Sequence, residues 1–159
     1  MTDLNEVSVD TKRASAVSQV DRDRMLEAMH ALEEATGRPA LAHSDVWTHE
    51  VSTALDRLES AFAEQRSSYE DPMGLMAEIA SDHPRLRTWV RQLRHRWVEL
   101  EATAHTFRQS LGSSPDTYSI HEVRERVRWL MGSVRHHRER EADLVFEALG
   151  IDLEGRSDR

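Results

Sequence analysis

The stretch of sequence that decides the fold is residues 86–111, LRTWVRQLRHRWVELEATAHTFRQSL. Its apolar side chains recur at alternating spacings of four and three residues: Leu86, Val90, Leu93, Trp97, Leu100, Ala104, Phe107 and Leu111. This spacing places all of them on one face of an α-helix. A helix with a single apolar face is marginal in water by itself, so we expect this face to pack against other helices.

Comparable apolar stripes predict three further long helices. A helix from about residue 21 to 36 has the stripe Met25, Met29 and Leu32, and one from about residue 44 to 69 has Trp47, Val51, Leu55, Leu58 and Phe62. Residues 75–80 add one or two helical turns. The last helix, which we expect Gly150 to end, carries Ile120, Val123, Val127, Leu130, Val134, His137, Glu141, Leu144 and Ala148. Because the connections are short, we predict an all-α, up-down four-helix bundle over residues 21–150.

The composition of the 159-residue chain narrows the class of protein further. Six glycines and four prolines are too few for the many turns of a β-sandwich or barrel. The absence of cysteine excludes a disulfide scaffold, a Cys-ligated zinc site, an iron–sulfur cluster and thiol catalysis. We find no glycine-rich phosphate loop and no nucleophile elbow, so we expect no catalytic residues and a protein that is not an enzyme.

The two ends of the chain are polar and lack a sustained apolar period. We therefore expect a disordered N-terminal tail over residues 1–20 and a C-terminal tail over residues 151–159. The first residues do not have the basic start and apolar core of a signal peptide. No apolar run approaches the roughly 20 residues of a membrane span. These features predict a cytoplasmic protein without a membrane partner.

The charge is unevenly distributed along the chain, although the net charge is -8. Residues 1–83 hold 7 basic and 17 acidic groups, whereas residues 84–140 hold 12 basic and 6 acidic groups. One interpretation is that acidic early helices pair with basic late helices, and the other is that an arginine-rich face takes an acidic partner. The overall acidity and the lack of a recognisable motif argue against nucleic-acid binding.

His137 and Glu141 interrupt the apolar stripe of the last predicted helix. They are four residues apart, so their side chains lie on the same face of the helix. A buried histidine and a buried carboxylate cost several kcal/mol unless they are paired, hydrogen-bonded or bound to a metal. The sequence therefore predicts either a polar cluster or a metal site inside the bundle.

The sequence around this pair resembles hemerythrin-like domains. The last helix of that family has a His, a Glu four residues later and then an apolar pair, which residues 137–146, HREREADLVF, match. Glu70, the helical restart at residues 74–75, and the segments 84–86 and 93–97 follow the layout of the family's second and third helices. The resemblance covers about residues 40–150, and it implies a four-helix bundle with a non-haem di-iron centre that serves oxygen binding, iron storage or sensing.

Carried over to this chain, the resemblance implies metal ligands at His137, Glu141 and Glu70. The family's second-helix histidine would fall near Gln65, and its third-helix histidine at Trp97. The remaining eight histidines lie off the apolar stripes, where we expect exposed side chains: His30, His43, His49, His83, His95, His105, His121 and His136. We therefore expect a degenerate site, a polar remnant with no cofactor.

These observations lead to one expected function and two alternatives. The expected function is a non-catalytic binding or regulatory protein with a degenerate metal site. The first alternative is a protein that binds iron or another divalent metal for oxygen or redox sensing. The second is a protein-interaction module that uses the arginine-rich face. Trp89 and Trp129 lie beside the apolar stripes and are suited to flank packing, to a protein partner or to a homo-oligomer contact.

Overall fold

The computed structural model describes the backbone of residues 3–40 and 44–157, and the side chains of residues 19–40, 45–114 and 116–150. These residues form five α-helices and two 3₁₀ turns: α1 (Asp3–Gly37), α2 (Ser44–Glu70), α3 (Leu75–Asp82), η1 (Pro84–Leu86), α4 (Arg87–Ser113), η2 (Pro115–Thr117) and α5 (Ile120–Ser157). No strand occurs in the described part of the chain. The prediction of an all-α fold with four long helices is confirmed.

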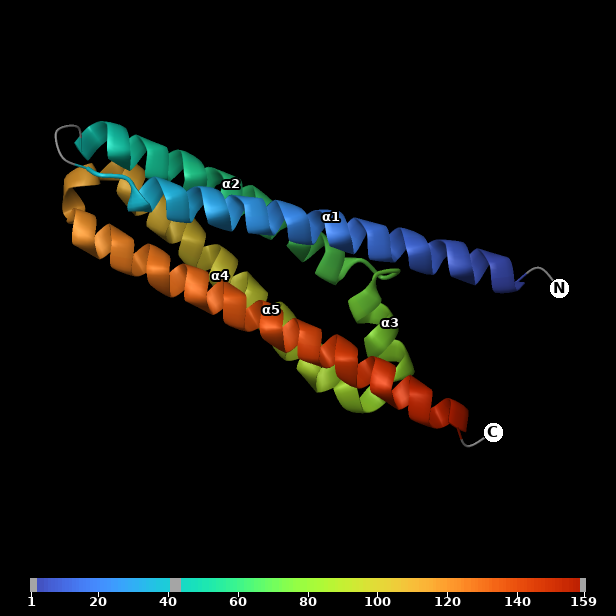
Figure 1. Cartoon of the computed structure of the whole chain (residues 1–159). Coiled ribbons are helices and arrows are strands. Elements are labelled where there is room, and N and C mark those ends of the chain that lie inside the picture. The colour runs from blue at the N-terminus through green and yellow to red at the C-terminus, as the bar shows by residue number, and fades with distance from the viewer. Residues whose placement is uncertain (1–2, 41–43, 158–159) are drawn as a thin grey trace.

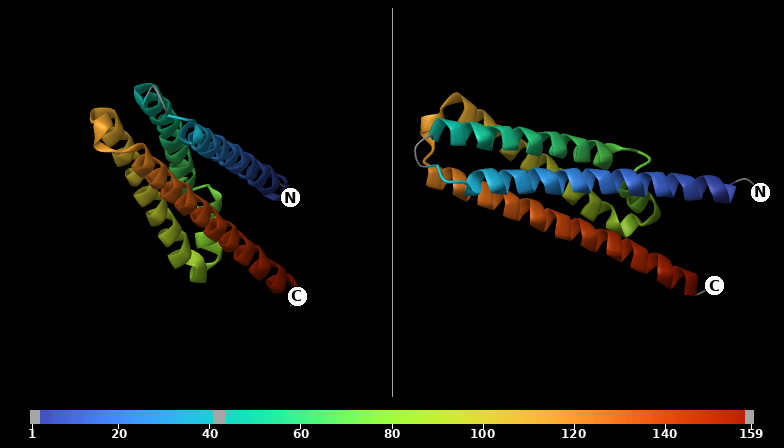
Figure 2. Two further views of the ribbon diagram at one scale, coloured as in Figure 1. Left: turned by 60° about the vertical axis from the view of Figure 1, so that its left-hand side comes forward. Right: turned by 45° about the horizontal axis from the view of Figure 1, so that its top comes forward.

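The four long helices pack side by side, and α3 is a short connecting helix. α1 packs against α2 and α5, α2 against α4, and α4 against α5. Figure 1 shows the end of α1, the start of α2 and the α4–α5 connection at one end of the bundle, and α3 toward the other. Figure 2 shows the same helices from two further directions. Each long helix therefore has a face directed at a shared interior.

The predicted apolar stripes form this interior. Every residue of the stripe on α4, with Leu86 just before it, is buried, and Trp97, Leu100 and Ala104 are completely inaccessible to solvent. The stripes of α1, α2 and α5 are buried as well, apart from Ile120 and Glu141, which are half-buried. None of the helices in the described residues is long and apolar enough to span a membrane.

Two helix boundaries differ from the sequence prediction. α1 begins at Asp3, so it includes most of the expected disordered tail over residues 1–20. Residues 3–36 contain neither glycine nor proline, and nothing in that stretch interrupts a helix once it has formed. α5 continues through Gly150 to Ser157, into the expected tail over residues 151–159. Gly150 does not have the positive φ of a helix-ending glycine, so it stays within the helix.

α5 begins with a reciprocal capping arrangement. The Ser119 hydroxyl accepts a hydrogen bond from the Glu122 backbone N–H at 3.1 Å, and the Ser119 backbone N–H donates to the Glu122 carboxylate at 2.7 Å. These two bonds satisfy backbone donors that the first turn of a helix leaves without partners. They therefore fix where α5 starts, seventeen residues before the His137 position.

Candidate functional site

His137 lies inside the bundle, as its position on the α5 stripe predicts. Its side chain is 2% exposed. The ring Nε2 donates a hydrogen bond to the backbone carbonyl of Leu93 on α4 at 3.0 Å. The ring centroid lies 4.8 Å from that of Trp97 and 5.9 Å from that of Tyr69. The histidine is therefore enclosed by aromatic rings and hydrogen-bonded to backbone.

The environment of His137 favours its neutral form. Burial is the largest effect and lowers the pKa of this imidazole. The Leu93 carbonyl and Glu141 raise the pKa by less, and Arg140 and Arg96 lower it by less again. Because Nε2 carries the proton in the bond to Leu93, Nδ1 holds a lone pair. Nδ1 is buried and has no hydrogen-bond partner among the described residues.

Glu141 is half-buried one helical turn beyond His137 and accepts two hydrogen bonds from α2. The Tyr69 hydroxyl donates to Oε2 through a short bond, and the Gln65 amide donates to the same oxygen at 3.3 Å. Burial is the main cause that raises the pKa of Tyr69, and the neighbouring carboxylate adds to it. The phenol therefore stays protonated and remains a donor.

Trp97 fills the centre of this cluster. Its indole N–H donates to the Phe62 carbonyl on α2 at 3.1 Å, and the ring is completely buried. The Trp97 ring lies 4.7 Å from Phe62 and 6.0 Å from Tyr69, measured between ring centroids. A large ring with its polar atom satisfied thus occupies the position where the family resemblance implies a histidine ligand.

Glu70, the third expected metal ligand, is exposed at the end of α2. Its neighbour Tyr69 is the α2 residue that contacts Glu141. Sequence reasoning did not identify Tyr69 as part of the site. Its spacing was the available signal, because Phe62, Gln65 and Tyr69 continue the α2 stripe at steps of three and four.

The residues in this interior do not fit a di-iron centre. No group of three or more His, Asp or Glu side chains in the described part of the chain comes close enough together to hold a metal ion. The Nε2 of His137 is bound to a backbone carbonyl, and the Oε2 of Glu141 already accepts two hydrogen bonds. The interior is arranged as a hydrogen-bonded polar cluster.

The other histidines divide into three groups. Six are exposed, as predicted: His30, His49, His95, His105, His121 and His136. His83 is 9% exposed, so its predicted surface position is wrong; it lies where α3 ends and η1 begins, and its backbone bonds to Ile79 of α3 and Leu86 of η1 hold it in this tight connection. His43 lies outside the described residues.

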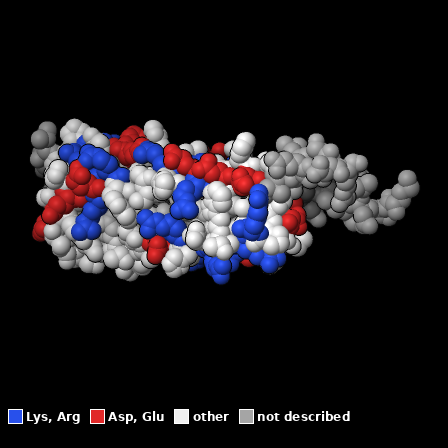
Figure 3. Space-filling view, turned by 90° about the horizontal axis from the view of Figure 1, so that it is seen from below, with Lys and Arg blue, Asp and Glu red and all other residues white. Residues whose placement is uncertain are grey.

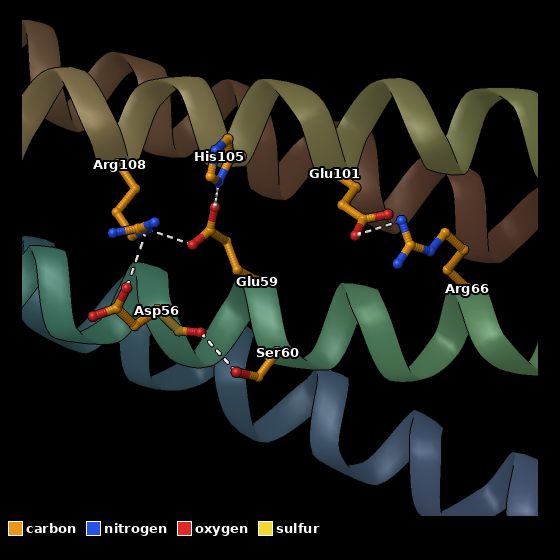
Figure 4. Close-up of polar contacts among 7 residues, drawn as sticks. All are labelled: Asp56, Glu59, Ser60, Arg66, Glu101, His105 and Arg108. Atoms are coloured by element: carbon orange, nitrogen blue, oxygen red, sulfur yellow. Dashed lines mark hydrogen bonds and ion pairs between the residues drawn. The ribbon is translucent and has the colours of Figure 1, made fainter.

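A second set of polar contacts joins α2 to α4 (Figure 4). The carboxylate of Glu59 contacts the His105 ring at 2.7 Å and the Arg108 guanidinium through a short bond. Arg108 also reaches Asp56 at 3.1 Å, and Arg66 reaches Glu101 at 3.4 Å. The contacts of Glu59 and Asp56 have the sense expected if acidic early helices pair with basic late helices, whereas the Arg66–Glu101 pair has the opposite sense.

Comparisons with known proteins give no family for this chain. No protein-family model matches it, and neither the curated proteins nor the solved structures that were searched contain a significant match.

Proposed function

We propose that this protein is a non-catalytic, hemerythrin-like helical bundle with a degenerate metal site, which has a binding or regulatory role. The observation that carries this proposal is Trp97. Its buried ring packs 4.8 Å from His137 and fills the level of the bundle at which a metal would need further ligands. An up-down arrangement of the four long helices is part of the same proposal.

The hydrogen bonds of the cluster support a structural role for its polar groups. His137 bonds to α4, whereas Glu141 bonds to two side chains of α2. α5 is thus connected to both helices at one level. Buried polar groups that are satisfied in only one arrangement can fix the register of packed helices. The pair His137 and Glu141 accordingly replaces metal coordination by direct contacts between helices.

The test is a measurement of metal content and of metal-dependent stability. The protein is produced in iron-supplemented medium, purified without chelator and analysed for iron, manganese and zinc. We expect far less than one metal ion per chain, no visible absorption band, and a melting temperature that neither chelator nor added iron(II) changes. A bound metal would stabilise the folded chain and raise the melting temperature.

His137→Leu provides the matched control. Stoichiometric iron in the parent protein that disappears in this variant would refute the degenerate site and would establish a metalloprotein for oxygen or redox sensing. Iron that persists in the variant would be bound elsewhere on the chain.

A second candidate function, a protein-interaction module, is favoured by one specific observation. Trp129 is 52% exposed on α5, with arginine side chains on both sides of it. Tryptophan and arginine are the side chains that most often dominate the binding energy of protein interfaces.

A further inference from the structure

α4 and α5 leave a groove along their outer side, with Trp129 in its middle. Two hollows, of about 450 Å³ and 560 Å³, lie end to end along these helices and share the Trp129 side chain. Gly132, which has no side chain, and Ser133, which has a small one, leave room for the second hollow. A Cβ added at Gly132 would meet no atom within 4 Å. Figure 3 shows the molecule from below the orientation of Figure 1, and on this face Lys and Arg side chains are interspersed with Asp and Glu side chains along its length.

The half of the groove nearest the α4–α5 connection is apolar. Phe107, Tyr118 and Leu130 line it together with Trp129. Arg126 lies over the Tyr118 ring at 4.5 Å and therefore covers one wall with its flat guanidinium. A hollow with these walls suits a large aliphatic or aromatic side chain.

The other half of the groove is basic. Arg96, Arg128 and Arg140 line it, and no Asp or Glu is among its lining residues. Arg96 pairs with Glu99 on α4, and Arg128 pairs with Glu125 on α5. In each pair the two side chains are exposed and three residues apart on one helix. Such exposed pairs contribute little, so both guanidiniums can turn toward an incoming carboxylate. Arg140 forms no ion pair with any residue whose side chain is described.

The spacing of these arginines favours an extended ligand over a small anion. Arg128 and Arg140 are twelve residues apart on α5, about 18 Å along the helix axis. A single phosphate or carboxylate cannot bridge that distance. An amphipathic helix lying in the groove can place carboxylates along the basic half and an apolar side chain in the other half.

We propose that the groove between α4 and α5 docks an acidic amphipathic helix of a partner protein, anchored by an apolar side chain against Trp129. The proposal deepens the binding role proposed above and rests on it. The metal measurement does not depend on the groove, so failure of one proposal can be distinguished from failure of the other.

The experiment uses the full chain and three synthetic peptides of about 18 residues, long enough as helices to span the groove. The peptides share a stripe of leucines at helical spacing and carry Glu, Gln or Lys at all other positions. Binding is followed by tryptophan fluorescence and by isothermal titration calorimetry at low and high salt. We expect the Glu peptide to bind at least tenfold more tightly than the Gln peptide, to weaken in high salt, and the Lys peptide not to bind.

Three variants locate the binding, and circular dichroism checks that each is folded. Trp129→Ala removes the anchor wall, Gly132→Leu fills the groove, and the double variant Arg128→Glu/Arg140→Glu reverses its charge. Each is expected to weaken binding of the Glu peptide at least tenfold. Arg91→Glu is the control, because it makes the same substitution once, with half the charge change of the double variant, on an exposed arginine of α4 outside the groove.

Three outcomes would overturn the proposal. The first is that none of the peptides binds. The second is that Arg91→Glu weakens binding as much as the double variant, which would show that the Glu peptide is attracted to positive charge anywhere on the surface and not to the groove. The third is that tripolyphosphate displaces the Glu peptide while Trp129→Ala has no effect, which would identify the groove as a site for small anions.

Discussion

Replacing His137 by leucine should make the stability of the protein less sensitive to acid. The imidazole is enclosed by Trp97, Tyr69 and Leu93, and burial lowers its pKa. Below the ordinary histidine pKa of 6.5, the unfolded chain therefore binds a proton that the folded chain does not accept. The folded state loses stability as the pH falls from 6.5 toward the lowered pKa, and at higher pH this loss is absent.

The size of the effect follows from this proton linkage. Each pH unit in the window costs about 1.4 kcal/mol for one proton. At about pH 5, one and a half units below the reference, the loss due to His137 is at most about 2 kcal/mol. At pH 7 the variant should differ little from the parent. It loses a hydrogen bond worth about 1 kcal/mol, but it also removes a buried lone pair without a partner, which costs about 1–3 kcal/mol.

The assay is urea denaturation of the parent and of His137→Leu between pH 5 and pH 7.5. As the pH falls, the unfolding free energy of the parent should decrease more than that of His137→Leu. His95→Gln is the control for the removal of a histidine, since the His95 side chain is 76% exposed and lies outside the buried cluster. Parallel curves for the parent and His137→Leu would refute the argument that burial keeps this imidazole neutral.

Two further predictions concern single substitutions measured by urea denaturation. Tyr69→Phe removes a hydrogen bond to a carboxylate and should cost about 1.5–3 kcal/mol, whereas Tyr118→Phe should change stability by less than about 0.5 kcal/mol. Because the pKa of Tyr69 is raised, the parent should also lose stability above pH 10, and Tyr69→Phe should reduce that loss; equal losses would contradict the assignment. Gly132→Ala should stabilise α5 by up to about 1 kcal/mol, but Gly74→Ala should destabilise, since its Cβ would lie 2.9 Å from the Ser68 carbonyl. A change in unfolding free energy of the same sign for both substitutions would contradict this account of the space around the two glycines.

Most of the fold is readable from the spacing of apolar residues. The stripe from Leu86 to Leu111 is buried throughout, because a strict alternation of three and four leaves a helix only one apolar face. The ends of the helices are less readable. Residues 3–20 lack a stripe but also lack a helix breaker, and Gly150 ends a helix only when its backbone takes a positive φ. Neither feature is decided by hydrophobic periodicity.

The site is only half readable in the same way. His137 and Glu141 are recognisable because they are polar residues on an apolar stripe, but their partners depend on the relative level of helices distant in sequence. The carbonyl of Leu93 carries no signature in the sequence, since every residue has one. Tyr69 and Glu70 are adjacent, and the turn of α2 decides that the phenol faces Glu141. The family resemblance implies the Glu70 carboxylate at this position because carboxylates are its metal ligands. The spacing of the α2 stripe instead places the Tyr69 phenol there.

Because Trp97 fills the interior of the bundle, the exposed Trp129 is the tryptophan that remains available to a partner. Trp97 fills the bundle and uses its N–H within it, whereas Trp129 is 52% exposed in a groove. A fully buried tryptophan removes up to about 250 Å² from water, so on the order of 100 Å² of Trp129 remains to be covered. At about 25 cal/mol per Å², covering it contributes roughly 2.5 kcal/mol, a factor between ten and a hundred in a dissociation constant. If the proposed acidic helix docks here, this one side chain would account for much of its affinity, and the arginines beside Trp129 would supply the preference for acidic residues.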